Sequence, residues 1–484
     1  MSTLSETLDE EKELNQHEIA PEDKVPMKEK IGYGLGVVAD HHAMVTLAWF
    51  ALPFFQDTIG LPAKFVGLFM MLAKAWDAIN DPLVGGISDN WRSKFGRRRP
   101  FILLGAVATG ICFPLLWMIP EEASELTQKI YFGATILLFY TFYSVFSVPY
   151  ESLGSELTPS YKERTNVFAV RAYVQNIFNP GINWYSYLAV AWFGGLLLGI
   201  RNFSWFIGLV IIVAGIMPAL FCKERYLDIA TKQKKVPVLK SLASVLRNGP
   251  LMIVIGTMAI YLLAIMSGGQ MSYYLNTYYL YNGDQELGLR LGAIDGTFRI
   301  PFYILGAYLV QKLTLKYDKH HLMLGSVGML FLSFFAMYFL ITPENPYLFL
   351  ITRPFLAIAE SGFWILIISM KADVCDWDEY VFGRRREGVI SATSNWFNKL
   401  FMAIALYLGT LILVDLVGYQ EDLGAAQPEG VLENMKLAYI ALPCTACAIA
   451  FLLLLKYPLN HKRLNDIRIE LESRRGKVAA EDES

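Results

Sequence analysis

The chain alternates long apolar segments with short polar ones, and this pattern sets the expected architecture. A helix that crosses a bilayer needs about 20 consecutive apolar residues. Segments of about that length occur twelve times in the 484-residue sequence. Their approximate bounds are 31–56, 65–88, 101–119, 130–153, 167–193, 203–222, 251–279, 291–311, 321–342, 347–371, 389–417 and 434–457. The pattern predicts an all-α integral membrane protein with twelve transmembrane helices.

Basic residues cluster in every second loop, which predicts how the chain crosses the membrane. Lys and Arg are nearly absent from loops 57–63, 120–128, 342–347 and 418–434, and they gather in the alternate loops. Loops rich in Lys and Arg stay on the cytoplasmic side. We therefore expect a multi-pass protein of the cell (inner) membrane with both termini in the cytoplasm. The regular alternation supports the number twelve, because one missed helix would invert every later loop.

The longest loop between segments is basic and divides the apolar segments into two sets of six. Two halves of six helices are the plan of the major facilitator superfamily, in which the solute site lies between the halves near mid-membrane. The N-terminal tail is acidic and polar, which predicts disorder and provides no secretory signal peptide. The predicted parts are a cytoplasmic tail (1–30), an N-terminal half (31–222), a cytoplasmic linker (223–250), a C-terminal half (251–457) and a cytoplasmic C-terminal tail (458–484).

The composition agrees with a membrane protein and argues against other classes. Hydrophobic residues make up 54% of the chain and charged residues 18%, against about 25% charged in soluble domains. The lone pair Cys444 and Cys447 lacks the second pair or the histidines that a metal or redox site needs. No nucleophile–base pair or metal-ligand set occurs, so we expect no enzyme, no cofactor and no nucleic-acid partner. A non-transporting sensor would need a signalling domain longer than either tail.

Two aspartates in the second segment are the most informative intramembrane residues. Asp77 and Asp81 are four residues apart, so both lie on one face of a helix, with Asn80 beside them. A charged side chain at mid-bilayer costs about 2.5–3.5 kcal/mol on insertion scales. Two on one face need compensation by a cation, a proton or basic residues. We interpret the pair as a cation site that couples cation and solute transport. The alternative is a structural motif that holds the helix near its cytoplasmic loop.

Polar residues in the first and fourth segments favour a solute site. Asp40 falls near mid-depth of the first segment, where a carboxylate suits hydrogen bonding to a solute. Ser144, Ser147 and Glu151 share one stripe of the fourth segment, close to Tyr143. Rings and hydroxyls together suit a sugar. The alternative is a tyrosine-rich helix that packs against lipid headgroups.

Two basic residues and a tryptophan extend this set. Arg171 lies near the cytoplasmic start of the fifth segment, where it either reaches the interface or pairs with a carboxylate or an anionic solute. Lys399 lies about ten residues into the eleventh segment, too deep to reach the interface easily. It is therefore the natural basic partner of Asp77 and Asp81. Trp364 either stacks on a sugar ring or packs in the core.

Together these motifs resemble those of the glycoside–pentoside–hexuronide:cation symporter family, the melibiose-permease-like branch of the major facilitator superfamily. The resemblance extends over most of the chain, from about residue 30 to 457. The matching motifs are Trp76–Pro82, followed by Arg92–Arg97, and the acidic stretch Asp373–Tyr380. The resemblance implies secondary active symport of a sugar with Na⁺ or H⁺ by alternating access, in a functional monomer.

The resemblance also implies roles for individual positions. The implied cation ligands are Asp77, Asn80 and Asp81, with Ser144 near that site. The implied solute residues are Asp40, Tyr143, Arg171, Trp364, Asn395 and Lys399. The chain departs from the family pattern at Ser147, where the family has a second sugar carboxylate, and Glu151 one turn further on is the candidate substitute. Because of this departure, the substrate can equally be an α-galactoside, another glycoside, a hexuronate or another anionic sugar.

Two loops of opposite charge on the cytoplasmic side are expected to form a gate. The basic loop contains Arg97, Arg98 and Arg99, and the acidic stretch contains Asp373, Asp376 and Asp378. We hypothesise that salt bridges between them close the inner side in the outward-open state.

The sequence leaves two functional questions open. The aspartate pair does not distinguish Na⁺ from H⁺, although Asn80 and Ser144 add neutral oxygens that suit a metal cation. The alternative function is that of a major facilitator transporter for a lipid, a drug or another non-sugar solute.

Overall fold

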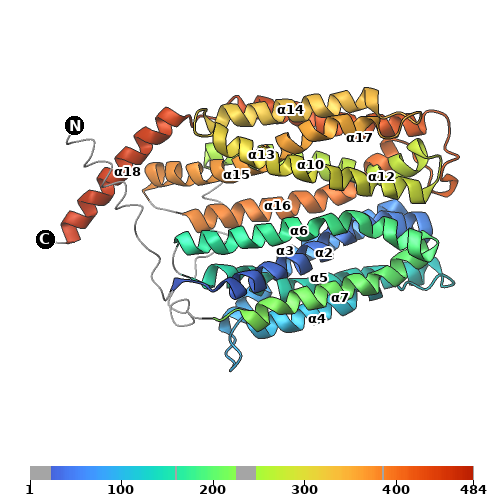
Figure 1. Ribbon diagram of the computed structural model, residues 1–484, viewed down its shortest axis with the longest axis horizontal. Helices are drawn as coiled ribbons and strands as arrows, with labels where there is room; N and C mark the ends of the chain where they lie inside the picture. The colour runs from blue at the N-terminus through green and yellow to red at the C-terminus, as the bar shows by residue number, and fades with distance from the viewer. Residues whose placement is uncertain (1–22, 159–160, 225–246, 384–385, 483–484) are drawn as a thin grey trace.

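The protein folds as a bundle of long helices that run side by side along its long axis (Figure 1). The computed structural model describes residues 23–158, 161–224, 247–383 and 386–482, and every regular element in these ranges is helical. The elements of the first half, with η for a π-helical or 3₁₀ segment, are α2 (Met27–Leu52), η2 (Pro53–Thr58), α3 (Ala63–Asn90), α4 (Arg99–Leu116), α5 (Glu125–Glu156), α6 (Tyr161–Phe193) and α7 (Leu196–Phe221).

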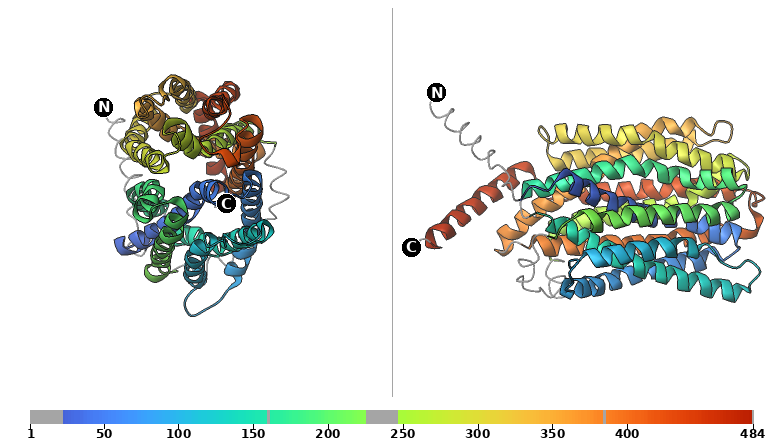
Figure 2. Two further views of the ribbon diagram at one scale, coloured as in Figure 1. Left: turned by 90° about the vertical axis from the view of Figure 1, so that its right-hand side faces the viewer. Right: turned by 60° about the horizontal axis from the view of Figure 1, so that its bottom comes forward.

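The helices of the second half are interrupted more often than those of the first. Its elements are α10 (Gly249–Gly269), α11 (Met271–Tyr274), η3 (Leu275–Leu280), α12 (Gln285–Phe298), α13 (Ile300–Leu313), α14 (Lys319–Leu340), η4 (Leu348–Thr352), α15 (Arg353–Phe382), α16 (Glu387–Leu411), η5 (Ile412–Leu416), η6 (Glu421–Leu423), α17 (Val431–Leu454) and α18 (His461–Asp482). The end-on view separates the blue-to-green first half from the yellow-to-red second half (Figure 2).

Nine of the described helical stretches are long and apolar enough to cross a membrane. The three predicted segments outside this set correspond to α3, α6 and the α12–α13 pair. Polar residues, such as Asp77 and Asp81 in α3, lower the mean hydropathy of α3 and α6, whereas α12 and α13 have only 14 residues each. The chain is therefore a multi-pass membrane protein, whereas the number twelve stays a prediction.

One expectation of the sequence is wrong in detail, because segment 291–311 is not one continuous helix. The chain breaks at Arg299, between α12 and α13. Pro301 lacks the N–H that a continuous helix needs, and Phe302 and Tyr303 both donate to the Arg299 carbonyl.

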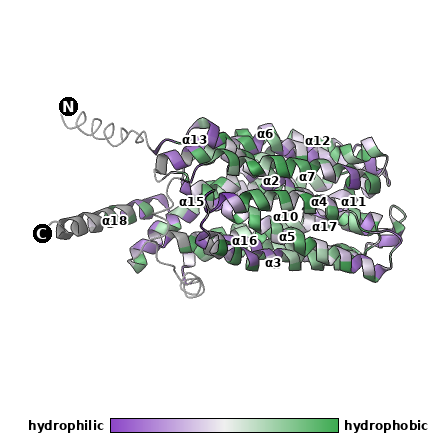
Figure 3. Cartoon of the chain, turned by 90° about the horizontal axis from the view of Figure 1, so that it is seen from below, coloured by the Kyte–Doolittle hydropathy of each residue, from purple (hydrophilic) through white to green (hydrophobic). Residues whose placement is uncertain are grey.

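The two ends of the bundle differ, and we name them by their loops. The terminal face carries the start of α2, loop 91–98 and α18; the opposite face carries loops 59–62 and 117–124. Hydrophobic residues cover the length of the helices, and hydrophilic ones gather toward the two ends (Figure 3). This distribution fits a bundle whose middle is surrounded by lipid.

The two halves contact each other closely toward the opposite face. The core of the first half continues there into second-half residues such as Tyr274, Leu413 and Tyr419. Gly67 of α3 lies against the side chain of Thr410 in α16, so a larger residue would push these helices apart. Trp184 Nε1 of α6 donates to Thr297 Oγ1 of α12 across 2.8 Å.

The predicted C-terminal tail contains an ordered helix, α18. Its residues Leu464, Ile467 and Leu471 are spaced at i, i+3 and i+7, so they share one face, and all three are buried in the second-half core. Helix α18 packs against α15. At the other end, α2 begins at Met27, within the predicted tail.

Candidate functional site

Four charged residues form an ion-pair cluster between the halves. Asp77 is fully buried, and its Oδ2 lies 2.8 Å from Lys74 Nζ and 3.3 Å from Lys399 Nζ. Lys399 Nζ also pairs with Asp81 Oδ2. Helix α3 contributes Lys74 and both aspartates, whereas α16 of the other half contributes Lys399. The structure therefore brings Lys399 to both carboxylates, which is the pairing inferred from the sequence.

Lys74 is a member of the cluster that the sequence reasoning missed. Besides its bond to Asp77, its ammonium lies 5.3 Å and 5.9 Å from the ring centroids of Tyr140 and Tyr143. A cation over an aromatic face is attracted by the ring. The signal was present in the sequence, since a lysine three residues before an aspartate lies on the same helix face. With Lys74 included, two lysines balance two carboxylates.

Oxygen atoms around the cluster remain available for a cation. Ser144 Oγ of α5 donates to Asp77 Oδ1 over 2.9 Å, so its lone pairs stay in the site. Asp81 Oδ1 is buried and has no hydrogen-bond partner among the described residues. Asn80 Nδ2 donates to the Thr141 carbonyl at 3.4 Å, which anchors Asn80 to α5. In the described ranges, no group of three His, Cys, Asp or Glu side chains could hold a metal.

The predicted solute residues of α2, α5 and α6 lie near this cluster. Tyr143 OH donates to Asp40 Oδ1 at 2.6 Å. Arg171 lies 3.9 Å from the Glu151 carboxylate and donates through Nε to the Tyr150 hydroxyl at 3.2 Å. Of the two alternatives for Arg171, the structure supports pairing with a carboxylate.

The two groups of residues are electrostatically connected. Lys399 and Asp81 both interact with Glu151, and Asp40 interacts with Glu151 and Arg171. The Glu151 side chain is 66% exposed, whereas Ser147, one turn away, is buried. Glu151 therefore keeps an accessible carboxylate one turn from Ser147, the position at which this chain lacks the carboxylate of the family pattern.

The remaining two predicted solute residues have other surroundings. Trp364 packs its ring on Phe363 and Tyr261, with centroids 5.6 Å and 6.2 Å apart, which is the packing alternative of the sequence analysis. Asn395 is exposed on α16, one turn before Lys399. In the part of the chain that the structure describes, no hydrogen bond or ion pair links either residue to Asp40 or Arg171.

The basic gate residues make their contacts within the first half. Arg97 and Arg98 share the carboxylate of Glu156 at 2.6 Å and 3.0 Å, and Arg98 also pairs with Asp89. Arg99 Nε donates to the Ala219 carbonyl at 2.5 Å. These arginines are therefore held at the terminal face by α3, α5 and α7.

The acidic gate residues likewise have partners in the second half. Asp373 accepts two hydrogen bonds from Lys319, and Asp378 accepts two from Arg386. These hydrogen bonds raise the pKa of the Arg386 guanidinium. Asp376 is half-buried on α15 between them. The bridges between the two loops were expected for the outward-open state, and they stay a prediction.

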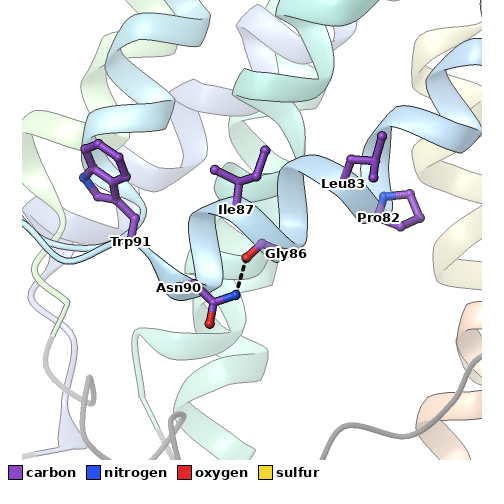
Figure 4. Close-up of a pocket in the computed structure, with 6 residues that line it drawn as sticks. All are labelled: Pro82, Leu83, Gly86, Ile87, Asn90 and Trp91. Carbon is purple, nitrogen blue, oxygen red and sulfur yellow. Dashed lines mark hydrogen bonds between the residues drawn. The ribbon is translucent and has the colours of Figure 1, made fainter.

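The surface of α3 is hollowed just beyond the ion-pair cluster (Figure 4). The groove has a volume of about 520 Å³ and begins at the residue after Asp81, on the side of the terminal face. It is lined by Pro82, Leu83, Gly86, Ile87, Asn90 and Trp91. Helix α3 is thus less closely covered here than at Gly67, where α16 contacts it.

Comparison with known proteins identifies the class. The sequence model of the family described as MFS/sugar transport protein matches residues 32–461, so the chain belongs to that family of membrane transporters and is not an enzyme. The uncharacterized symporter YnaJ of Bacillus subtilis is 27% identical over 93% of this chain and 96% of its own length. The isoprimeverose transporter of Lactiplantibacillus pentosus is 25% identical over 90% of this chain and 89% of its own.

A solved structure agrees on the fold. The crystal structure of the nucleoside transporter NupG matches with a TM-score of 0.62 at 12% identity, over 89% of this chain and 99% of that one. At this identity the match shows the major facilitator fold alone. It confirms the fold that the two sets of six segments predicted.

Proposed function

We propose that the protein is a secondary active symporter that moves a sugar or glycoside together with Na⁺ or H⁺. The observation that carries this proposal is the cluster of Lys74, Asp77, Asp81 and Lys399 between the two halves. Ionisable groups at this depth are costly unless they serve transport or are fully paired. Membership of the MFS/sugar transport family and the names of its relatives support the sugar.

The mechanism we propose is competition between a cation and Lys399. In the empty carrier two ammonium groups neutralise two carboxylates, so no net charge is occluded. A Na⁺ ion or a proton binds at Asp81 and Asp77 and displaces the Lys399 ammonium. The released lysine then turns toward Glu151 and the solute. Because partly loaded states leave a charge uncompensated, only the empty and the fully loaded carrier change conformation readily.

The solute site of this proposal lies beside the cluster. Asp40, Glu151 and Arg171 offer charged hydrogen-bond partners for sugar hydroxyls, and Tyr143 and Ser147 add neutral ones. Trp364 and Asn395 belong to the second half and would contribute after a change of conformation.

We further propose that the terminal face is cytoplasmic. The distribution of Lys and Arg among the loops supports this orientation. The described inter-half contacts lie at the cluster and toward the opposite face, at Gly67, Trp184 and Thr410. In this orientation the structure corresponds to an inward-facing carrier.

Charge reversal in the proposed inner gate is expected to shift the carrier toward the inward-facing state by about tenfold. Arg97→Glu and Asp376→Lys each replace an attraction across the gate with a repulsion of several kcal/mol at most. Fluorescence energy transfer between labels at Lys94 and Lys316, both exposed at the terminal face, reports the distance.

Two controls accompany this experiment. Arg92→Glu reverses a charge in the same loop, but Arg92 bonds only backbone carbonyls of Asp89 and Trp91 among its described contacts, so little change is expected. The double variant Arg97→Glu with Asp376→Lys should restore the wild-type distances. Unchanged distances in both single variants contradict the gate.

The proposed function is tested by uptake into vesicles. A panel of labelled neutral sugars, glycosides and hexuronates is offered under an imposed Na⁺ gradient, an imposed H⁺ gradient or neither. We expect at least about tenfold accumulation of one solute class with one of the gradients, because a tenfold cation gradient supplies about 1.4 kcal/mol per coupled ion. The absence of stimulation by either gradient over the whole panel contradicts sugar symport.

A further inference from the structure

Two π-helical turns meet at the opposite face, one from each half. The turn η2 follows α2, and η3 follows α10 and α11, so each one ends the first long helix of its half. A third, η5, ends α16. π-Helical turns are rare and occur frequently at functional sites. The proposed cation and solute sites include no residue of these turns.

The carboxylate of Asp57 in η2 accepts hydrogen bonds from three residues of the second half. Tyr273 OH donates to Oδ2 at 2.7 Å, and Tyr278 OH donates to Oδ1. Gln285 Nε2 reaches Oδ2 at 3.4 Å. The preceding residue, Gln56, accepts from Tyr274 OH. One turn of the first half is thus bonded to three tyrosines around one turn of the second half.

The bond of Gln56 is buried, and the bonds of Asp57 are partly buried. Gln56 and Tyr419 are 2% exposed, and Tyr274 is fully buried. The Tyr274 ring packs on Tyr419 with centroids 5.1 Å apart and on Tyr278 at 6.2 Å. Two weaker contacts lie nearby: the exposed pair of Lys64 and Asp415, and the bond from the Ala63 N–H to Glu421 at 2.9 Å.

We propose that Asp57 with Tyr273, Tyr274 and Tyr278 forms a gate that holds the opposite face closed. The name tyrosine gate is used below for these four residues. The carboxylate is satisfied by neutral hydroxyl donors, which water replaces at small net cost when the gate opens. A lysine or arginine partner would bind the carboxylate more tightly and would carry a second charge to desolvate. Hydroxyl donors therefore suit a closed state that must open again at small cost in free energy.

The geometry also explains why π-turns occur here. A π-turn inserts one extra residue into a helix and re-aims the side chains that follow it. Tyr273 and Tyr274 precede the turn, at the end of α11, and η3 brings Tyr278 to the same side of η2, whereas the neighbouring Tyr279 points to its own half and donates to Glu433 of α17 at 2.7 Å. Tyr278 therefore bonds to the first half and the adjacent Tyr279 bonds within the second half, so Tyr279 is a matched control for Tyr278.

The test is a distance measurement across the opposite face in the full-length chain. The five native cysteines are replaced, and spin labels are attached at Glu122 and Glu344, which are exposed on loops of different halves. Double electron–electron resonance then gives the populations of the closed and open states. In Asp57→Asn and in Tyr278→Phe we expect a second, longer distance and an increase of about tenfold in the open-to-closed ratio.

Tyr279→Phe should leave the distances as in the wild type, because its hydroxyl binds within the second half. The same distances in Asp57→Asn, Tyr278→Phe and the wild type would overturn the proposal. So would an equal shift in Tyr279→Phe, which would indicate general loosening of η3. The measurement uses neither solute nor cation gradient, so its outcome is independent of whether the carrier transports sugar.

Discussion

Asp77→Asn is expected to abolish cation-driven uptake, with a loss of about 100-fold or more. The substitution leaves Asp81 with two lysines, Lys74 and Lys399, so the cluster changes from neutral to a charge of +1. A positive cluster repels the coupling cation, and removal of one partner from a buried ion pair costs about 3–5 kcal/mol. The Ser144 hydroxyl also loses the carboxylate to which it donates. Uptake and its dependence on the cation gradient, measured in the same vesicles, check this.

Asp89→Asn is the matched control for this variant. Asp89 lies on the same helix, and its partner Arg98 keeps a second carboxylate in Glu156. The Asp89 side chain is 46% exposed, so it needs no partner to stay hydrated, and the buried Arg98 remains neutralised by Glu156. Uptake within about twofold of the wild type is therefore expected. If Asp77→Asn keeps gradient-driven uptake at the level of Asp89→Asn, the cation site is assigned to the wrong residue.

Lys399→Gln is expected to have the second-largest effect. It should lower the stability of the empty carrier and raise its affinity for the cation. Asp77 keeps Lys74, but Asp81 loses the ion pair that neutralises it in the empty carrier. Removal of one member of such a pair costs about 3 kcal/mol. The same change removes the competitor of the cation, so affinity for the cation should rise. Thermal unfolding of the purified protein, with NaCl compared with choline chloride at equal ionic strength, measures both effects.

The expected result is a lower midpoint without Na⁺ and a larger Na⁺-dependent increase than in the wild type. A ligand that binds only the folded state stabilises it in proportion to the logarithm of its concentration over its dissociation constant. Lys64→Gln is the control, because Lys64 also pairs across the halves, with Asp415, but both side chains are exposed. A Na⁺-dependent increase in Lys399→Gln no larger than in the wild type would contradict competition. A midpoint that rises with falling pH and ignores Na⁺ would assign the coupling ion to H⁺.

The partners of the basic and acidic loops at the terminal face do not follow from loop charge alone. The sequence predicts attraction between the loop of Arg97 and the acidic stretch of Asp373. In the structure Arg97 contacts Glu156 and Asp373 contacts Lys319, each in its own half. Alternating access gives such residues different partners in different states, so no single set of pairs follows from charge alone.

The sequence by itself determined the membrane class, the two-half plan and the shared helix face of Asp77 and Asp81. These features depend on hydrophobic run length, loop charge and the i,i+4 spacing, which are local properties of the chain. The depth of Lys399 in its segment indicated it as the partner of this pair, whereas tertiary structure alone decided its distances to the two carboxylates and the partners of Asp57, Arg97 and Asp373. Lys399 reaches Asp81 across 318 positions of sequence, and Asp57 meets Tyr278 across 221. Such contacts depend on how two separately folded halves pack, and no spacing along the chain encodes that packing.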